Sequence, residues 1–204
     1  MKRLISSIAI ICLSAMMAFA AGNTSAEAKK ILDKAASKVN LSKGATANFS
    51  ISGGKIGNQS GTISIKGTKF QASTASTIVW FDGKTQWTYM KNNDEVNIST
   101  PSAAKQASMN PYTFINIYKK GYNLSVENTA SGKQVHLVAQ NKNASIKEMY
   151  ILVDANSNIK QVKMKQSAGW YSISISNLKS KPLSDAIFTF KSKDYPKAEV
   201  IDLR

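Results

Sequence analysis

The sequence predicts a mainly β protein with a few helices, built as an antiparallel meander, a barrel or a strongly curved sheet. From Ala47 onward, apolar and polar residues alternate with a period of two, which is typical of strands with one buried face. Turn signals such as Gly53-Gly54, Asp82-Gly83 and Ser131-Gly132 separate the short runs. Short strands with regular turns form such sheets, and helical segments interrupt the series here.

The chain of 204 residues has the length of one domain with an ample core. It contains no internal repeat and no low-complexity linker, so a single domain is expected over residues 21–204. Besides the strands that begin near Ala47, strands are expected at 77–82, 85–90, 94–99, 122–127, 133–139, 146–153, 158–166, 170–177 and 186–191.

Residues 1–20 have the composition of a secretory signal. The basic start Met1-Lys2-Arg3 precedes an apolar run that ends in Ala18-Phe19-Ala20, a small-x-small pattern of the kind that signal peptidase cleaves. The run is shorter than the ~20 residues of a membrane-spanning helix. We therefore expect cleavage after Ala20 or Ala21 and export from the cytoplasm; the alternative is an uncleaved anchor.

Cys12 lies inside this apolar run, and the bulky Ile11 precedes it where a bacterial lipoprotein signal needs a small residue. Cys12 is therefore expected to leave with the signal. One cysteine and one histidine exclude a disulfide framework within the chain and the usual multi-ligand metal centres. No Gly-rich phosphate loop, G-x-S-x-G elbow or H-E-x-x-H motif is present. We expect neither a cofactor nor an enzymatic activity.

Two helical regions are expected, at 24–39 and within 101–120. Thr24 and Glu27 fit a capping box, and an apolar stripe at helical spacing follows them. In the second region Pro101 and Pro111 each follow a capping residue, and the region ends at Gly121. Its last part presents an apolar face made of Phe114, Ile115 and Tyr118.

The formal net charge of +15, from 27 basic and 12 acidic residues, raises the possibility of a nucleic-acid partner. The lysines are dispersed and not clustered with stacking aromatic residues, which argues against that partner. Lys163 and Lys165 alternate with Val162 and Met164, as in a strand with one basic face in water. Such a face favours anionic membrane surfaces or an acidic partner, or simply maintains solubility.

The run Asp82-Gly83-Lys84-Thr85-Gln86-Trp87-Thr88-Tyr89 resembles the D-G-K-T-x-W-x-Y hairpin of the periplasmic lipoprotein carrier family, LolA. Its Asp82-Gly83 pair suits a type I′ turn. Near the C terminus, Ile187-Phe188-Thr189-Phe190 and Val200-Ile201-Asp202-Leu203-Arg204 resemble the closing F-x-F and V-x-D-x-R elements of that family. The resemblance covers essentially all of residues 21–204. It implies an incomplete antiparallel β-barrel, closed by helical lid segments around an apolar cavity.

The resemblance also implies a function. Carriers of this family bind the acyl chains of lipoproteins and shuttle them through the periplasm, from an inner-membrane ABC transporter to an acceptor at the outer membrane. The expected partners are therefore acylated lipoproteins, that transporter and that acceptor, with no nucleic acid and a monomeric chain. The alternative is a related half-barrel that acts as an outer-membrane lipoprotein acceptor or as an envelope-stress sensor.

Aromatic residues are concentrated in the half of the sequence that holds the interrupting helices, and methionine suits a pocket for chains of varied shape. The helices at 24–39 and 101–120 are expected to form the lid. The expected lining of the cavity is Phe49, Ile51, Ile63, Ile65, Phe70, Trp80, Trp87, Tyr89, Phe114, Ile115, Tyr118, Met149, Ile151 and Met164.

In the family, an arginine in the strand before the segment that matches Thr68-Lys69-Phe70 latches the lid. The corresponding stretch here is Ile65-Lys66-Gly67, so the latch is Lys66, another group, or absent.

Overall fold

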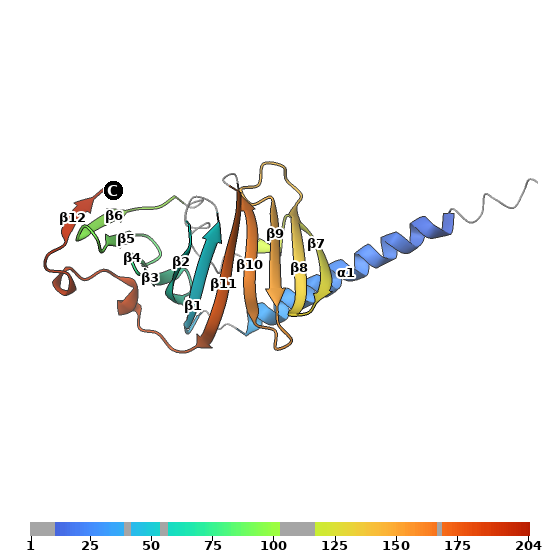
Figure 1. Cartoon of the computed structure of the whole chain (residues 1–204), viewed down its shortest axis with the longest axis horizontal. Helices are drawn as coiled ribbons and strands as arrows, with labels where there is room; N and C mark the ends of the chain where they lie inside the picture. Colours follow the sequence, from blue (N-terminus) through green and yellow to red (C-terminus); the bar gives the residue numbers. More distant parts are fainter. Residues whose placement is uncertain (1–10, 39–41, 54–56, 103–116, 167–168) are drawn as a thin grey trace, which may run out of the picture.

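The computed structural model describes residues 11–38, 42–53, 57–102, 117–166 and 169–204, with side chains from Thr24 onward (Figure 1). Within these residues the chain forms helix α1 (Ile11–Ser37) and the short 3-10 helices η1 (Asp185–Phe188) and η2 (Ser192–Asp194). The strands are β1 (Ala45–Gly53), β2 (Gln59–Lys66), β3 (Lys69–Thr74), β4 (Thr77–Phe81), β5 (Gln86–Met90), β6 (Glu95–Ser99), β7 (Tyr122–Thr129), β8 (Gly132–Ala139), β9 (Glu148–Val153), β10 (Ile159–Gln166), β11 (Gly169–Ser180) and β12 (Glu199–Asp202).

All of these strands belong to one curved sheet with the order β12-β6-β5-β4-β3-β2-β1-β11-β10-β9-β8-β7 (Figure 1). Neighbouring strands are antiparallel, except that β12 pairs with β6 in parallel. β7 and β12 are its two edges and do not pair with each other in the described part of the chain, so the sheet is not closed into a barrel. The predicted fold class, an incomplete antiparallel β-barrel, is confirmed.

The strand register assigns each residue to one of two faces of the sheet, because side chains alternate along a strand. We call the face that carries Ala47, Ile63 and Met149 the inner face, and the opposite one the outer face. On the inner face, Phe49 of β1 lies between Gly61 of β2 and Ile175 of β11, and the same alternation continues to β7. Both faces are therefore defined over the whole sheet.

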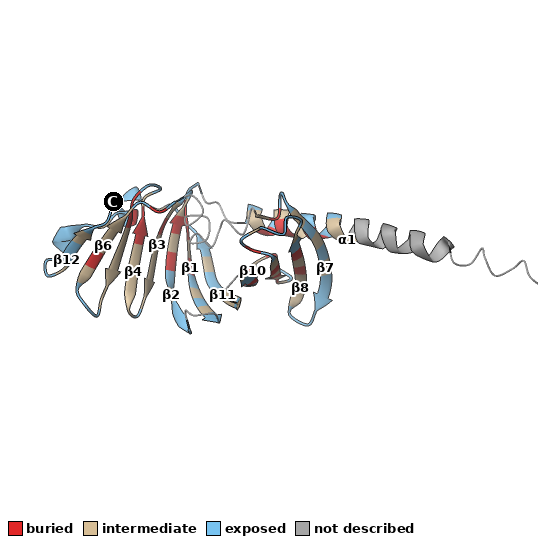
Figure 2. Ribbon diagram, turned by 90° about the horizontal axis from the view of Figure 1, so that it is seen from above, coloured by how far each residue is buried: buried red, intermediate tan, exposed pale blue. Residues whose placement is uncertain are grey.

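Helix α1 covers the inner face of the half of the sheet formed by β7 to β10 (Figure 1). Ala28, Leu32 and Ala35 recur at helical spacing and are buried against strand residues such as Leu137 and Met149, which have no exposed surface. Figure 2 shows these buried segments beside α1. This half of the sheet has a closed core.

At the other end of the sheet, the segment between β11 and β12 covers the outer face. Phe188 of η1 is fully buried, and the ring centroid of Phe190 lies 5.6 Å from that of Trp80. Tyr195 completes the cluster, 5.5 Å from Trp80 and 4.7 Å from Tyr89. The two ends of one sheet thus bury opposite faces.

Three local expectations are corrected by the structure. Helix α1 begins at Ile11 and continues through Thr24, because the Ala- and Met-rich stretch before Thr24 has high helix propensity. Residues 186–191 do not form a strand; η1 occupies their start, and β12 takes the free edge of β6 instead. Asp82 lacks the positive φ of a type I′ turn, because its carboxylate accepts hydrogen bonds from the Lys84 and Thr85 amides.

The predicted end of the second helical region at Gly121 agrees with the structure, where Gly121 has φ +82° and β7 begins at Tyr122. A positive φ is accessible to glycine without the steric cost of a side chain, so the helical turn at residue 117 stops there. Among the described residues, no helix is long and apolar enough to span a membrane.

Candidate functional site: an apolar inner face

The inner face is apolar along its central part, and among the described residues its burial is uneven. Under α1, the inner-face residues of β8, β9 and β10 are buried almost completely; Ile151 is 1% exposed. On the central strands β1 and β11, Phe49, Ile173 and Ile175 pack against this core and remain only partly buried. Ile51 on the same face is also only partly buried. An apolar strip next to the closed core is therefore the candidate binding surface.

A glycine creates room for the largest side chain of this strip. Gly61 of β2 lies opposite Phe49 in the register, and a Cβ added at Gly61 would lie 3.2 Å from the tip of the Phe49 ring. The same Cβ would come within 2.0 Å of the Ser73 carbonyl oxygen on β3. Only glycine allows β2 and β3 to approach this closely beneath the ring.

Polar contacts join α1 to the segment before β7. The Tyr118 hydroxyl donates a hydrogen bond to Asp33 Oδ1 at 2.6 Å, and Lys29 Nζ pairs with Asp33 Oδ2 at 2.6 Å. The hydrogen bonds from Lys29 and Tyr118 hold the pKa of Asp33 below its ordinary value, whereas burial and this carboxylate raise the pKa of Tyr118. The two regions expected to form a lid are thus tied together at the edge of the apolar core.

The predicted cavity residues do not all lie together in the structure. Tyr118 is buried in the core, beside α1. Phe114 and Ile115 lie outside the described residues. The predicted residues on the inner face are Phe49, Ile51, Ile63, Ile65, Phe70, Met149, Ile151 and Met164.

The expectation that Trp80, Trp87 and Tyr89 share this wall is wrong. Phe70 pairs with Phe81, so the adjacent Trp80 points to the outer face. Trp87 pairs with Trp80 and therefore lies on the same outer face, as does Tyr89 two residues on. Aromatic character alone does not show which face a residue occupies; the register does.

Sequence reasoning missed several residues of the strip. Val79, Phe81, Ile173 and Ile175 lie on the inner face together with the residues that were predicted. The alternation of residues 171, 173 and 175 along one strand was a usable signal. For β4 no such signal exists, because Ile78, Val79, Trp80 and Phe81 form a continuous apolar run.

Lys66, one of the options for a latch, lies on the outer face. Its Nζ donates to the Leu183 carbonyl oxygen at 2.9 Å and pairs with Asp185 Oδ1 at 3.1 Å, while Lys69 pairs with Asp185 Oδ2 at 3.3 Å. These lysines, Lys66 foremost, hold the pKa of Asp185 below its ordinary value. In the described part of the chain, Lys66 therefore fixes the C-terminal segment, not a helix over the inner face.

The polar groups available at the inner face limit what it can do. No cluster of three or more His, Cys, Asp or Glu side chains fit to hold a metal ion occurs among the described residues. His136 lies on the outer face, between the buried Val135 and Leu137. The inner face offers a packing surface for an apolar molecule.

The fold is an open half-barrel with an apolar inner face and a helix across one half of that face. The profile of the family described as outer membrane lipoprotein carrier protein LolA matches residues 16–169 of the chain. The chain belongs to this family, as its D-G-K-T-x-W-x-Y hairpin indicated. No curated protein sequence matches it.

Solved structures share the fold at low sequence identity. An uncharacterised conserved protein from Thermus thermophilus is 15% identical, with a TM-score of 0.55 over 86% of this chain and 99% of that one. LprF from Mycobacterium bovis is 10% identical, with a TM-score of 0.50 over 79% of this chain and 96% of that one. At such identities the similarity shows the fold alone.

Proposed function

We propose that this protein is a periplasmic carrier that binds the acyl chains of lipoproteins and moves them from the inner to the outer membrane. The observation that carries the proposal is the partly buried apolar strip of Phe49, Ile51, Ile173 and Ile175 beside the sealed core. Membership in the carrier family supports it.

The physical need for such a strip follows from the chemistry of the cargo. Each methylene of an acyl chain costs about 0.8 kcal/mol to leave in water, so a sixteen-carbon chain costs on the order of 12 kcal/mol. A carrier must shield the chain and must also release it. A strip that is apolar but not filled by the protein's own core provides this balance, since binding does not require the core to open.

In this proposal the helix expected at 24–39, which lies within α1 up to Ser37, and the region 101–120 act as the lid, and the Tyr118–Asp33 hydrogen bond holds their edges together. The residues already buried in the closed core, such as Met149, support the wall from beneath and do not touch the cargo. Residues 1–20 are the export signal, which predicts a mature chain that begins at Ala21 or Gly22 and carries no lipid. Intact-mass measurement of the protein from cells tests that part.

The binding site is tested with a fluorescent sixteen-carbon fatty acid as probe. Ile51→Asp places a charge in the strip, and Ser50→Asp places the same charge on the exposed outer face one residue away. We expect Ile51→Asp to weaken probe binding about tenfold or more, because a carboxylate in the strip must be desolvated by the probe, whereas Ser50→Asp binds like the wild type. Circular dichroism confirms that both variants are folded.

The cargo is tested in cells by placing a photocrosslinking side chain at Ile175 on the inner face and, as a control, at Ser174 on the outer face. We expect acylated lipoproteins to be captured from position 175 only. Capture from both positions, or from neither, would contradict the carrier function even if the fatty acid binds in vitro.

A further inference from the structure

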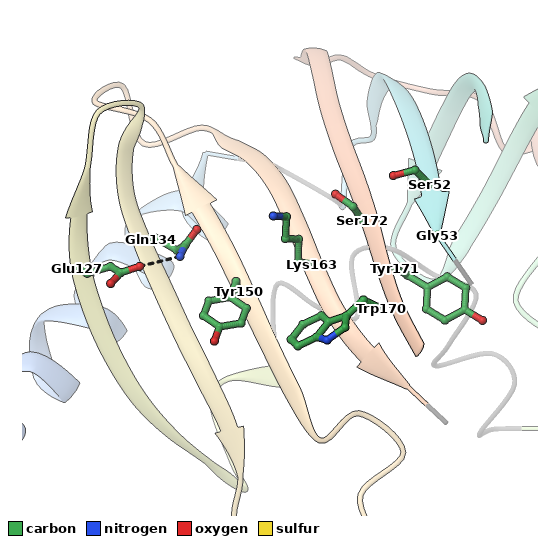
Figure 3. A pocket seen from close by; sticks show the side chains of 9 residues that line it. All are labelled: Ser52, Gly53, Glu127, Gln134, Tyr150, Lys163, Trp170, Tyr171 and Ser172. Atoms are coloured by element: carbon green, nitrogen blue, oxygen red, sulfur yellow. Dashed lines mark hydrogen bonds between the residues drawn. The ribbon is translucent and has the colours of Figure 1, made fainter. Parts of the chain in front are cut away.

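On the outer face, above the closed half of the sheet, the structure contains a pocket of about 560 Å³ that the proposed carrier function does not use (Figure 3). Such a volume is in the range of small-ligand pockets. It is lined by Ser52, Gly53, Glu127, Gln134, Tyr150, Lys163, Trp170, Tyr171 and Ser172. Six strands contribute, from β7 to β1.

Two neighbouring cross-strand rows of the outer face contribute Tyr150, Lys163, Trp170 and Ser172 to this pocket. One row runs Val138, Glu148, Lys165, Trp170 from β8 to β11, and the next runs His136, Tyr150, Lys163, Ser172. Trp170 is 42% exposed. The indole is therefore presented to solvent and not absorbed into the core.

The aromatic groups are held in fixed orientations. The His136 ring stacks on Tyr150 with centroids 4.2 Å apart and an interplanar angle of 1°, and the Tyr150 hydroxyl donates to Glu148 Oε1 at 3.0 Å. The Tyr150 and Trp170 centroids are 5.8 Å apart, and Lys165 Nζ lies 5.8 Å from the centre of the Trp170 ring. Tyr150 and Trp170 form a rigid aromatic wall.

The polar groups around this wall are both donors and acceptors. Gln134 Nε2 donates to Glu127 Oε1 at 2.7 Å, which leaves the Gln134 carbonyl and the second Glu127 oxygen for a ligand. Lys163 adds a donor, and Ser52 and Ser172 add hydroxyls that both donate and accept. Figure 3 shows these groups arranged around Tyr150 and Trp170.

The local charge is balanced, although the whole chain carries +15. Glu127 offsets Lys163 within the pocket, and Glu148 offsets Lys165 in the row beside it. An anionic membrane surface is therefore not favoured at this place, and Lys163 disfavours an organic cation against the aromatic wall. A neutral ligand with one apolar face and many hydroxyls fits both the wall and the rim.

From this arrangement we infer that the pocket binds a neutral saccharide, with a pyranose ring packed on Tyr150 and Trp170 and its hydroxyls bonded to Gln134, Glu127 and Lys163. The C–H face of a pyranose is apolar and flat enough to pack on an indole, and its edges need mixed donors and acceptors. The site lies on the opposite face from the apolar strip. The saccharide inference therefore does not depend on the acyl-chain carrier function.

The test uses two neutral oligosaccharides, chitotetraose and cellotetraose. Each is titrated to millimolar concentrations into the protein without its signal, residues 21–204. Binding is followed by the indole N–H resonances in NMR spectra. We expect the Trp170 resonance to shift, while those of Trp80 and Trp87, at the other end of the sheet, stay in place. The affinity should not change with salt, because the ligand is uncharged.

Trp170→Ala removes half of the aromatic wall and is expected to weaken binding about tenfold or more. Trp87→Phe, a milder change to a tryptophan outside the pocket, should leave affinity unchanged. Gln134→Ala removes a hydrogen-bonding partner without altering charge and should weaken binding severalfold. Because Trp170 is exposed, Trp170→Ala is expected to fold, and circular dichroism of each variant serves as the check.

Three outcomes would overturn the inference. The first is that neither oligosaccharide shifts the Trp170 resonance at millimolar concentration. The second is that binding survives in Trp170→Ala. The third is that the pocket binds vesicles that contain anionic phosphatidylglycerol in a salt-dependent manner, and that Lys163→Gln abolishes this binding. The last result would identify the outer face as a membrane-docking surface.

Discussion

The two ends of the sheet bury apolar side chains on opposite faces. From β7 to β10, helix α1 covers the inner face, and residues such as Val135 and Leu137 are fully buried there. At β5 and β6 the inner face carries polar residues such as Asn97, and the outer face is covered instead, with Val96 fully buried and Phe188 seated in the covering segment.

This comparison explains where the apolar strip can exist. A sheet that is covered on one face at each end must change the covered face somewhere between them. Between the two covers, Phe49, Ile173 and Val79 of the inner face remain only partly buried. Their inner-face neighbours Ile65, Phe70 and Phe81 are buried. The partly buried strip thus lies in the zone between the two covers.

The largest expected effect comes from disrupting the segment between β11 and β12, which covers the outer face. Phe188→Ala removes a fully buried ring and should destabilise the protein by about 3–5 kcal/mol. Its neighbour Ile187 is 37% exposed, and Ile187→Ala should cost less than about 1 kcal/mol. Urea unfolding of both variants measures the difference. Equal effects would show that the C-terminal segment does not contribute a core of its own.

Two inner-face isoleucines of different exposure test the distinction between the closed core and the partly buried strip. Ile151 is 1% exposed under α1, so Ile151→Ala should cost about 2–5 kcal/mol of stability. Ile51 is only partly buried, and Ile51→Ala should cost about 1 kcal/mol while lowering affinity for a fatty acid. Thermal unfolding and probe binding separate the two; a reversed order of stability losses would contradict the assignment of core and strip.

A smaller effect is expected at the joint between α1 and the segment before β7. Tyr118→Phe removes the hydrogen bond to Asp33 and should cost about 1–2 kcal/mol, because Asp33 keeps Lys29 as a partner. Hydrogen exchange should become faster in residues 117–121 and in α1. The control Tyr122→Phe, which loses a hydrogen bond to the Ile146 carbonyl oxygen, should leave exchange in α1 unchanged.

The smallest effect concerns pH. The native pKa of Asp33 lies below its ordinary value of 3.8, so the native state favours the charged carboxylate. Its contribution to stability is present above pH 3.8 and is lost as the pH falls through the lower native value. The side chain is 42% exposed, so screening keeps the contribution small. The stability difference between wild type and Asp33→Asn should therefore shrink on acidification, as followed by urea unfolding; a difference that grows would contradict it.

The sequence by itself determined the fold class and the family. The period of two, the regular turns and the D-G-K-T-x-W-x-Y hairpin are local signals, and each stands in a continuous stretch of chain. Alternation also identified inner-face residues such as Ile63 and Met149. These features depend on the two-residue repeat of a strand, which is written into neighbouring residues.

Only the tertiary structure decided which face each end of the sheet buries. In the run Ile78-Val79-Trp80-Phe81 both faces are apolar, so no local pattern tells whether Trp80 meets the acyl-chain strip or the C-terminal segment. The answer depends on Phe190 and Tyr195, more than a hundred residues later, which pack on Trp80 from the outer side. The Tyr150–Trp170 pocket likewise requires cross-strand neighbours that are distant in sequence. Such contacts follow from the register of the whole sheet, and no short stretch of the chain determines that register.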